Sequence, residues 1–371
     1  MIRLGDRVVG SGAPALIIAE LGTSHQGDLS RARSMIDAAV DAGADCVKFQ
    51  LVYATELLHP RSGLVDLPTG RIPLFERFRE LERDLSFYAA LKTHTESRGA
   101  LFLCSPFGIQ SARELHRLGA EAIKVASPEL NHLPLLQEVS AFGVPLFLSS
   151  GVSTLADIEQ ALSITGRNNV VLLHCITAYP APEEQYNVSV LRSLRAVFGV
   201  EVGLSDHSLD PELVPTAAAA CGAVAVEKHF TLSREGSGLD DPIALEPRDF
   251  SRMVAAVRAA ERLGPEAAIA GLGARYGRQR VDAVLGSGIK TLAAAERENY
   301  RRTNRSIHAL REIPQGAVIR SQDVALLRTE KVLRPGLPPE LLPRVIGAHA
   351  MRLIPDGEGV EWEDILPSQG S

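Results

Sequence analysis

Cysteine is scarce in this chain of 371 residues, and its arrangement excludes one class of protein. Cys46, Cys104, Cys175 and Cys221 are widely spaced, form no Cys-x-x-Cys pair, and mostly have apolar neighbours. A small secreted domain held together by disulfides would need a denser cysteine framework. We therefore expect four buried, reduced thiols.

Long apolar runs and a dominant charge are also lacking. The longest small-apolar run, Ala217 to Val226, is too short to span a bilayer, and the opening MIRLGDRVVGSGAP lacks the continuous apolar core of a signal peptide. The net charge of -6 comes from interspersed charges of both signs, which argues against nucleic acid or an acidic membrane surface as the main partner. The sequence predicts a cytoplasmic protein with no membrane or nucleic-acid partner.

What the sequence does contain is a regular alternation of apolar β-type runs with helical stretches from about residue 15 to 262. This pattern predicts a parallel sheet built through right-handed crossovers. The eight runs are ALIIAE (15–20), CVKFQ (46–50), LFLCS (101–105), EAIKVAS (121–127), PLFLSS (145–150), VVLLHC (170–175), EVGLS (201–205) and AVAVEKHF (223–230). An open doubly wound sheet shares the alternation, but eight units in roughly 250 residues favour the closed (β/α)8 TIM barrel.

Three further segments complete the predicted organisation. Residues 51–84 carry glycine and proline signals and are expected to pass over the barrel mouth, with a lid as one role. A barrel of residues 1–265 is followed by a Gly- and Ala-rich linker over 266–300 and a small domain over 301–371. Short apolar runs separated by IPQG, RPGLPP and IPDGEG make the small domain turn-rich and mostly β.

Polar side chains end nearly every predicted strand, and in a TIM barrel the active site forms at the C-terminal strand ends. Lys48 and Lys124 alternate with apolar residues, so each ammonium group needs a partner in a poorly hydrated place. One interpretation is a structural ion pair with a barrel glutamate. The other is an anionic ligand held by both lysines and the neighbouring serines, and we favour a phosphate or carboxylate.

His207 and His229 end adjacent predicted strands, so their imidazoles should lie on one rim. A lone histidine is more often held by hydrogen bonds than by a metal, but two at neighbouring strand ends form a credible partial metal site. With no cysteine expected nearby, the remaining ligands would be oxygen atoms. That set suits manganese or a similar divalent ion better than zinc.

The motifs resemble those of the sialic acid synthase (N-acetylneuraminate synthase-like) family. The resemblance covers almost the whole chain and rests, in the family's order, on IIAELGTSHQGD, AGADCVKFQ, FLCSPF, IKVASPELNHLPLL, LSSGVSTLADIE, LLHCITAYPAP, GLSDHS, VEKHFT and LEPRDF. The end of the chain, from SIHALREIPQGAVI to VEWEDIL, is similar to the family's antifreeze-like (SAF) domain, a β-clip fold. The resemblance implies condensation of phosphoenolpyruvate with an N-acylated amino sugar, which gives a nonulosonic (sialic-type) acid and phosphate.

By motif position, the resemblance also implies residue roles. Glu20 would line the reaction centre, and His207 and His229 would act through a bound divalent metal, Mn²⁺ with Mg²⁺ or Co²⁺ as alternatives. The implied reaction needs a proton acceptor and a proton donor, and our candidates for them are Glu20 and Glu129. The residues implied for phosphoenolpyruvate are Lys48, Lys124, Ser127, Ser150 and Ser205. Those implied for the sugar hydroxyls are Gln50, Tyr179 and Asp240, and Thr177 is a further substrate-binding candidate. In the family the small domain of one subunit covers the barrel of the other, so Arg334 would reach the sugar across a domain-swapped homodimer.

Three positions depart from the family pattern near the implied substrates: Thr177 stands in place of asparagine, Pro128 of glycine and Asp241 of histidine. The identity of the acceptor sugar is therefore open. Two other functions also stay open. One is a metal-dependent barrel aldolase on a phosphorylated substrate, with Lys124 or Lys48 forming a Schiff base, which borohydride would trap. The other is a catalytically silent sugar-binding relative, which would bind ligand without releasing phosphate.

Overall fold

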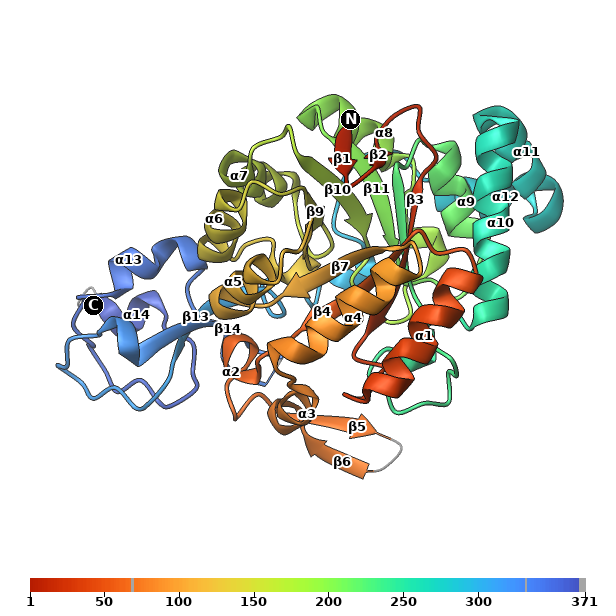
Figure 1. The fold of residues 1–371 in the computed structure, drawn as a ribbon. Helices are drawn as coiled ribbons and strands as arrows, with labels where there is room; N and C mark the ends of the chain where they lie inside the picture. Colours follow the sequence, from red (N-terminus) through yellow and green to blue (C-terminus); the bar gives the residue numbers. More distant parts are fainter. Residues whose placement is uncertain (68–69, 331, 367–371) are drawn as a thin grey trace.

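Eight parallel strands close into a barrel in the computed structural model, which describes residues 1–67, 70–330 and 332–366 (Figure 1). Neighbours in the barrel follow chain order, as the predicted TIM barrel requires. The strands are β3 (Leu16–Gly22), β4 (Cys46–Leu51), β7 (Leu101–Pro106), β8 (Ile123–Val125), β9 (Leu146–Ser149), β10 (Val170–Cys175), β11 (Glu201–Asp206) and β12 (Ala225–His229). The eight apolar runs of the sequence are these strands, with ends that differ by a few residues.

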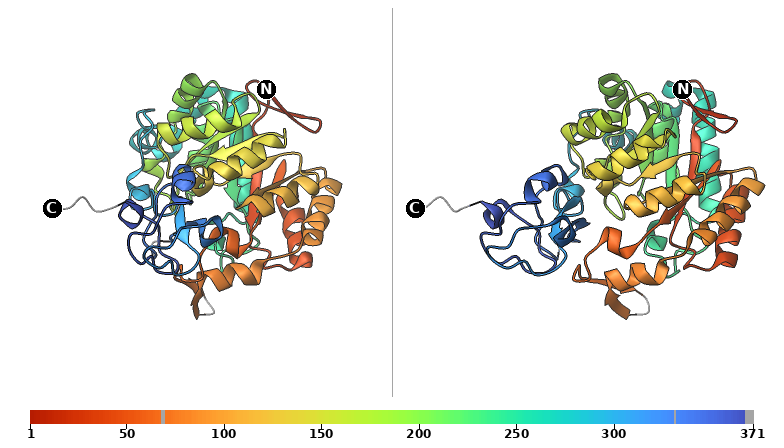
Figure 2. Two further views of the ribbon diagram at one scale, coloured as in Figure 1. Left: turned by 90° about the vertical axis from the view of Figure 1, so that its left-hand side faces the viewer. Right: turned by 60° about the vertical axis from the view of Figure 1, so that its left-hand side comes forward.

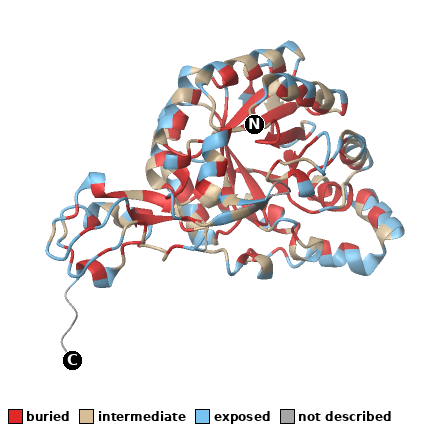
Figure 3. Ribbon diagram, turned by 90° about the horizontal axis from the view of Figure 1, so that it is seen from below, coloured by how far each residue is buried: buried red, intermediate tan, exposed pale blue. Residues whose placement is uncertain are grey.

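Helices surround the barrel and bury one apolar stripe each against it. They are α1 (Leu29–Asp41), α4 (Leu85–Ser97), α5 (Ile109–Arg117), α6 (Leu133–Ala141), α7 (Leu155–Thr165), α8 (Val190–Phe198), α9 (Leu213–Ala220) and α10 (Pro247–Leu263). Local signals fix their ends: Asp28 caps α1, and Thr154 and Asp157 form a capping box at the start of α7. Figure 3 shows the result, with buried strands inside and helices exposed on their outer faces.

A short N-terminal hairpin closes the end of the barrel opposite the candidate site. Its strands β1 (Ile2–Leu4) and β2 (Arg7–Val9) are antiparallel, and Ile2, Leu4 and Val9 are buried. These side chains form one cluster with residues near the beginnings of the barrel strands, among them Leu16 and Phe147. The hairpin acts as a plug that keeps water out of the lower barrel core.

The excursion after β4 forms its own small layer. It contains α2 (Ala54–Leu57), the hairpin strands β5 (Leu64–Leu67) and β6 (Gly70–Pro73), and α3 (Leu74–Leu81). Its apolar side chains, Leu57 and Phe75 among them, cluster with Phe107 from the loop after β7. The cluster attaches the excursion to the C-terminal side of the barrel, where the sequence predicted it.

The predicted linker over 266–300 needs correction for its first part. Residues 265–285 form two helices, α11 (Pro265–Tyr276) and α12 (Arg278–Leu285), each ending at a glycine with positive φ. Ala268 of α11 packs with Ala220 and Ala260, so this pair belongs to the outer layer of the barrel. Alanines that fit closely against neighbouring helices account for the Gly- and Ala-rich composition that suggested a linker.

Residues beyond the connecting stretch form a small domain with its own core. Its strands β13 (Arg305–Ala309) and β14 (Val324–Arg328) pair with each other in antiparallel fashion. The domain also contains isolated β-bridges, such as the one between Ile313 and Ile354, and the short helices α13 (Leu342–Val345) and α14 (Trp362–Ile365). Figures 1 and 2 show this domain to one side of the barrel, with β13 and β14 nearest to it. The turn-rich, mostly β prediction is confirmed. In the described residues, no helix is long and apolar enough to cross a membrane.

Candidate active site at the barrel mouth

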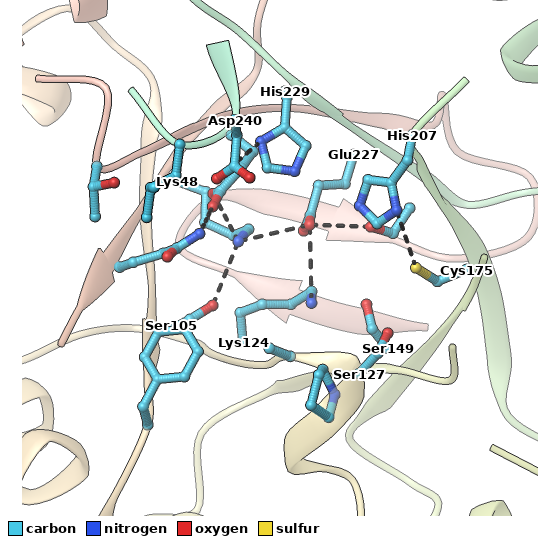
Figure 4. Close-up of a pocket in the computed structure, with 18 of the residues that line it drawn as sticks. Lys48, Ser105, Lys124, Ser127, Ser149, Cys175, His207, Glu227, His229 and Asp240 are labelled. Atoms are coloured by element: carbon cyan, nitrogen blue, oxygen red, sulfur yellow. Dashed lines mark hydrogen bonds and ion pairs between the residues drawn. The ribbon is translucent and has the colours of Figure 1, made fainter. Parts of the chain in front are cut away.

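A cavity of about 220 Å³ opens at the C-terminal ends of the barrel strands. Each of the eight strands, or the residues directly after it, contributes a side chain to the lining, and the excursion and small domain add a few more (Figure 4). Its polar lining consists of Glu20, Thr23, Lys48, Gln50, Ser105, Lys124, Ser127, Ser149, Cys175, Tyr179, Ser205, His207, Glu227, His229, Asp240 and Arg328. The cavity stands where the TIM-barrel fold places active sites.

Strand alternation decides which polar side chains face the cavity. In β12, Glu227 and His229 line the cavity, whereas Lys228 between them is fully buried outside it. Lys228 Nζ lies 2.6 Å from Asp206 Oδ2, and Asp206 likewise alternates with the cavity-lining residues Ser205 and His207. Because β11 and β12 alternate in the same phase, Ser205, His207, Glu227 and His229 face the cavity, and Asp206 and Lys228 form a structural ion pair on the outer side of the barrel.

Two buried lysines and two buried glutamates meet on the floor of the cavity. Lys48 Nζ lies 2.6 Å from Glu20 Oε2 and 3.6 Å from Glu227 Oε1, while Lys124 Nζ lies 3.9 Å from Glu227 Oε1. Ser105 Oγ is 3.4 Å from Lys48 Nζ, and Ser205 Oγ donates to Glu227. The sequence left open whether Lys48 and Lys124 form structural ion pairs or bind an anion. The ion pairs are present, but they lie inside the cavity, so the same lysines can also bind a ligand.

The two lysines differ in how well their charge is balanced. Burial opposes charge on Lys48, but Glu20 and Glu227 outweigh it and raise the pKa of this lysine. Burial lowers the pKa of Lys124, and Glu227 at 3.9 Å offsets only part of that effect. An anion in the cavity would stabilise the charged form of Lys124, so this lysine is the natural anchor for a phosphate.

The predicted histidine pair stands on the same rim. The ring centroids of His207 and His229 are 5.3 Å apart, and the Tyr179 ring lies 4.3 Å from that of His207. His207 Nδ1 is 2.8 Å from the Ile176 carbonyl oxygen. That bond fixes the ring and leaves Nε2 as the nitrogen for a metal, the usual arrangement of a metal-binding histidine.

The imidazoles of His207 and His229 have very different pKa values, because the buried charges around them differ. Burial alone would lower the pKa of His207, but the Cys175 thiolate and the bonds to Cys175 and the Ile176 carbonyl raise it to about 9. Burial and repulsion by His207 lower the pKa of His229 to about 3. The expectation of no nearby cysteine is wrong: Cys175 Sγ lies 3.7 Å from His207 Nδ1, because β10 and β11 are neighbours. All four cysteines are buried and unpaired, as predicted.

The residues present fit a divalent ion that is only partly held by protein. Within residues 1–67, 70–330 and 332–366, no group of three or more His, Cys, Asp or Glu side chains is placed to hold a metal ion. The imidazoles of His207 and His229 must both be deprotonated to bind a metal, so an ion would displace the proton of His207. Together with the carboxylates of Glu20 and Asp240 they would leave most coordination positions to water or substrate oxygens. Such an open arrangement is what a catalytic ion needs.

Most of the predicted site residues come together, and four do not. Those that line the cavity are Glu20, Lys48, Gln50, Lys124, Ser127, Tyr179, Ser205, His207, His229 and Asp240. Ser150 turns its hydroxyl to the Leu173 carbonyl at 3.1 Å, because the pleat directs its neighbour Ser149 inward instead. Thr177 also stays outside the lining, and its backbone N–H donates to Glu296.

Glu129 is held away from the cavity by two arginines of the small domain. Both of its carboxylate oxygens are occupied, one by Arg305 and the other by Arg328, and the side chain is fully buried. Burial would raise the pKa of Glu129, but the two guanidinium groups lower it. A carboxylate held ionised in this way is a poor proton acceptor, so the catalytic role predicted for Glu129 is corrected to a structural one.

Arg334 lies in the small domain, outside the cavity of its own chain. Its guanidinium is paired with Glu361 at 3.1 Å and Asp364 at 2.9 Å. A different arginine of the small domain, Arg328 at the end of β14, lines the cavity and lies over the Phe107 ring at 5.4 Å.

Several lining residues were missed by sequence reasoning. Glu227 had a signal, because it stands two positions before His229, a predicted inward residue of the same strand. Ser149 had none that separated it from Ser150. Ser105 is the last residue but one of β7 and Cys175 is the last of β10, so both could have been chosen on that ground. Arg328 had no local signal, since its place depends on how the small domain packs.

The fold and the site together define a TIM-barrel protein with a cavity lined by lysines, serines and two histidines at the C-terminal ends of its strands. Comparison with known proteins makes this specific: the profile of the NeuB family matches residues 35–267, and the chain belongs to this family. It is 34% identical to the spore coat polysaccharide biosynthesis protein SpsE of Bacillus subtilis over 98% of this chain and 97% of that protein. Its identity to the N,N'-diacetyllegionaminic acid synthase of Campylobacter jejuni is 31%, over 82% and 87% of the two chains.

Solved structures agree with the family. The crystal structure of SpsE from Bacillus subtilis superimposes with a TM-score of 0.82 at 32% identity, covering 99% of both chains. The N-acetylneuraminic acid synthetase of Leptospira borgpetersenii, in complex with citrate, gives a TM-score of 0.64 at 30% identity, covering 80% of this chain and 94% of that one. Human N-acetylneuraminate-9-phosphate synthase is 29% identical over 98% of this chain and 96% of that protein. The chain is therefore a synthase of this family.

Proposed function

We propose that this enzyme condenses phosphoenolpyruvate with an N-acylated amino sugar to form a sialic-type nonulosonic acid and phosphate. The observation that carries the proposal is the convergence of Lys48, Lys124, His207 and His229 over one cavity in a chain of the NeuB family. Two ammonium groups beside a row of hydroxyls suit a small phosphorylated carboxylate. Two imidazoles beside them suit a divalent ion that polarises a sugar aldehyde.

Phosphoenolpyruvate lies on the floor of the cavity in this proposal. Lys124 neutralises its phosphate, and the hydroxyls of Ser105, Ser127, Ser149 and Ser205 accept or donate around the remaining oxygens. Support comes from Ser149, whose buried hydroxyl has no hydrogen-bond partner among the described residues and would gain one from the ligand.

A divalent ion, Mn²⁺ with Mg²⁺ or Co²⁺ as alternatives, would be held by His207 and His229 and would supply Lewis acidity to the sugar aldehyde. Carbon–carbon bond formation between the enol carbon and the aldehyde leaves positive charge on the phosphate-bearing carbon. Glu20 takes a proton from the water that adds there. Glu20 is suited to this role because Lys48 at 2.6 Å and Gln50 at 2.6 Å fix both of its oxygens at the reacting end of the cavity. The alkoxide formed from the aldehyde takes up that proton from Glu20. The tetrahedral carbon then loses the phosphate, which leaves with its bonding electron pair. Lys48 can deliver a proton to the departing phosphate and regain one from the hydroxyl on that carbon, which becomes the keto group.

The test is a phosphate-release assay with phosphoenolpyruvate, Mn²⁺ and a panel of N-acylated amino sugars. Phosphate should appear only when sugar, phosphoenolpyruvate and metal are all present, and chelation should stop it. Lys124→Met should lower kcat/KM for phosphoenolpyruvate by about 100-fold or more, because a buried phosphate loses its cation. Lys92→Met, on the outer helix α4, is the matched control and should leave kcat/KM unchanged. Full activity in Lys124→Met, or no phosphate from any sugar, would refute the proposal.

One observation favours a second candidate, a Schiff-base aldolase. Lys124 is buried in the cavity and its pKa is lowered, which is the environment that makes a lysine amine nucleophilic. Borohydride with a keto acid or phosphorylated aldehyde would then attach the substrate to Lys124. The synthase reaction needs no such adduct, so trapping decides between the two.

The assembly and location of the enzyme complete the proposal. We propose a cytoplasmic domain-swapped homodimer in which the small domain is of the antifreeze-like (SAF) type and Arg334 reaches across to the sugar of the other subunit. The cluster of buried apolar residues within the small domain supports a stable separate unit. Sedimentation velocity of the full chain would measure the oligomeric state, and a monomer at assay concentrations would refute the dimer.

A further inference from the structure

A buried ion pair lies directly behind the two histidines of the cavity. Asp206 is the last residue of β11 and precedes His207, and Lys228 precedes His229 in β12. Asp206 and Lys228 are register partners where these parallel strands pair. Both side chains are fully buried, and Lys228 Nζ lies 2.6 Å from Asp206 Oδ2. The Asp206–Lys228 pair therefore connects the two backbones that carry the imidazoles.

The same pair also holds the turn on which His207 stands. Asp206 Oδ1 accepts the backbone N–H of Ser208 at 2.9 Å, and Asp206 Oδ2 accepts the Ser208 hydroxyl at 3.0 Å. Lys228 Nζ donates to the Ser208 carbonyl oxygen. The residues on both sides of His207 are thus bonded to each other and to the residue before His229.

A buried tyrosine adds a further support to His207. Tyr186 Oη accepts the backbone N–H of His207 at 2.6 Å. The Tyr186 side chain is fully buried, and the Tyr186 carbonyl oxygen lies 2.7 Å from His174 Nε2. Because His207 Nδ1 is 2.8 Å from the Ile176 carbonyl oxygen, both the backbone and the ring of His207 are held.

The chemistry of the Asp206–Lys228 pair sets it apart from its neighbours on the same face of the barrel. Two residues earlier in each strand, Leu204 and Val226 pack into the apolar layer between strands and helices. Apolar side chains in place of a buried ion pair are often as stabilising or more so. What an ion pair with hydrogen bonds adds is a fixed direction and length. Such a pair suits a role in which distance matters more than stability.

We propose that the Asp206–Lys228 pair and Tyr186 are positioning groups for the metal. They set the distance between the imidazoles of His207 and His229 before a divalent ion binds. The two ring centroids are 5.3 Å apart, and both rings face the cavity (Figure 4). An ion with few protein ligands depends on those few being held in place. The inference rests on the proposed function, which places the ion there, and it assigns residues outside the cavity to the metal site.

The test measures Mn²⁺ binding to the full-length protein without substrate, at one fixed pH, from the EPR signal of free Mn²⁺. The double variant Asp206→Asn with Lys228→Met removes the ion pair but leaves the net charge behind the histidines unchanged, so a change in affinity reports geometry. Its Kd for Mn²⁺ should rise by about 10-fold or more. Its unfolding in urea should stay close to that of wild type, because no buried charge is left unpaired. An unchanged Kd in the folded double variant would overturn the inference.

The matched control removes an ion pair of the same length at the opposite end of the barrel. Asp45, just before β4, lies 2.6 Å from Arg258 of α10. The double variant Asp45→Asn with Arg258→Met should keep the wild-type Kd for Mn²⁺. An equal rise of Kd in this control would assign the effect to general loosening of the barrel and would also overturn the inference.

A single variant decides the question if the first double variant does not fold. Tyr186→Phe keeps the buried ring and removes only the hydroxyl that holds the His207 backbone. Its Kd for Mn²⁺ should rise by about 10-fold. Tyr300→Phe, which loses a hydroxyl bond to Asp157 outside the cavity, should keep the wild-type Kd. A wild-type Kd in Tyr186→Phe would refute the positioning role and leave the proposed function standing. No Mn²⁺ binding by the wild-type protein would refute the metal in both.

Discussion

Single side chains at the mouth combine structural and chemical duties. Glu227 accepts a hydrogen bond from Ser205 and lies within ion-pair distance of both Lys48 and Lys124. Burial would raise the pKa of Glu227, but the two lysines lower it and keep it ionised. Glu227 thereby holds both ammonium groups in place before any anion arrives, which is how a site is preorganised.

Glu296 is a positioning residue that lies outside the cavity. Its Oε1 accepts the backbone N–H groups of Val152 at 2.7 Å and Thr177 at 2.8 Å, and Oε2 accepts that of Ala293 at 3.3 Å. Val152 has a φ of 42°, a conformation that an L residue adopts only when its surroundings enforce it. Glu296 therefore clamps the loops after β9 and β10, which follow Ser149 and Cys175.

Replacing Glu296 by alanine should raise the KM for phosphoenolpyruvate more than it lowers kcat. The unclamped loops would no longer hold Ser127 and Ser149 at the phosphate, and the free energy of unfolding should fall by about 1–3 kcal/mol. Glu296→Gln keeps one acceptor oxygen and should lie between wild type and alanine. Steady-state kinetics with urea unfolding checks this, and Glu298→Ala at an exposed neighbouring position is the control. An unchanged KM would assign Glu296 a purely structural role.

At the scale of elements, the hairpin of β13 and β14 is the part that joins the small domain to the barrel. Arg305 of β13 is fully buried, pairs with Glu129, and donates to the Phe107 and Leu326 carbonyl oxygens. Leu58, after α2, forms an isolated parallel bridge with Arg328. The hairpin thus fastens the excursion, the loop after β7 and the loop after β8 at one place beside the cavity.

Arg305→Met should destabilise this junction strongly. It would leave the buried Glu129 with one cation in place of two, and breaking a buried ion pair costs about 3–5 kcal/mol. The double variant Arg305→Met with Glu129→Gln should recover part of the loss, because the unpaired charge is gone. Thermal and urea unfolding of the single, double and Arg302→Met control variants measures this, since Arg302 is exposed. A single variant as stable as wild type would contradict the role of the pair.

For the whole molecule, buried neutral histidines set the sensitivity to acid. Burial lowers the pKa of His25, His132 and His308 to about 4, and nearby arginines such as Arg83 and Arg305 add to the effect at His25 and His132. In the unfolded chain each would titrate near 6.5. Between these values the unfolded chain binds more protons than the folded one, so stability is full above about pH 6.5 and falls as the pH drops toward 4.

The expected slope is on the order of 1.4 kcal/mol per pH unit for each such histidine. Urea unfolding of the full chain at several pH values between about 7 and 5 measures it. His308→Gln should reduce the slope of the free energy of unfolding against pH by the contribution of one histidine. Glutamine can keep the bonds to Ser306 and the Gly357 carbonyl but does not titrate. His349→Gln, at an exposed position, should leave the slope as it is. A stability that rises on acidification would contradict this assignment.

The amino-acid sequence by itself determined the barrel and most of its site. Strand and helix patterns are local, with periods of two and 3.6 residues, so ALIIAE or VVLLHC predicts a strand without knowledge of the fold. The parallel barrel then brings strand ends together, which is why Lys48, Lys124, His207 and His229 could be placed on one rim before the structure was known.

Only the tertiary structure decided what depends on packing between distant segments. It set Glu129 against Arg305 and Arg328, placed Arg328 in the cavity, and made helices α11 and α12 part of the barrel wall. It also chose Ser149 over Ser150, because the phase of a strand is fixed by the neighbours it pairs with. The charge of each side chain and the periodicity of each segment are properties of the sequence. Which charged residues form ion pairs is decided only by the packing of distant segments in the folded chain.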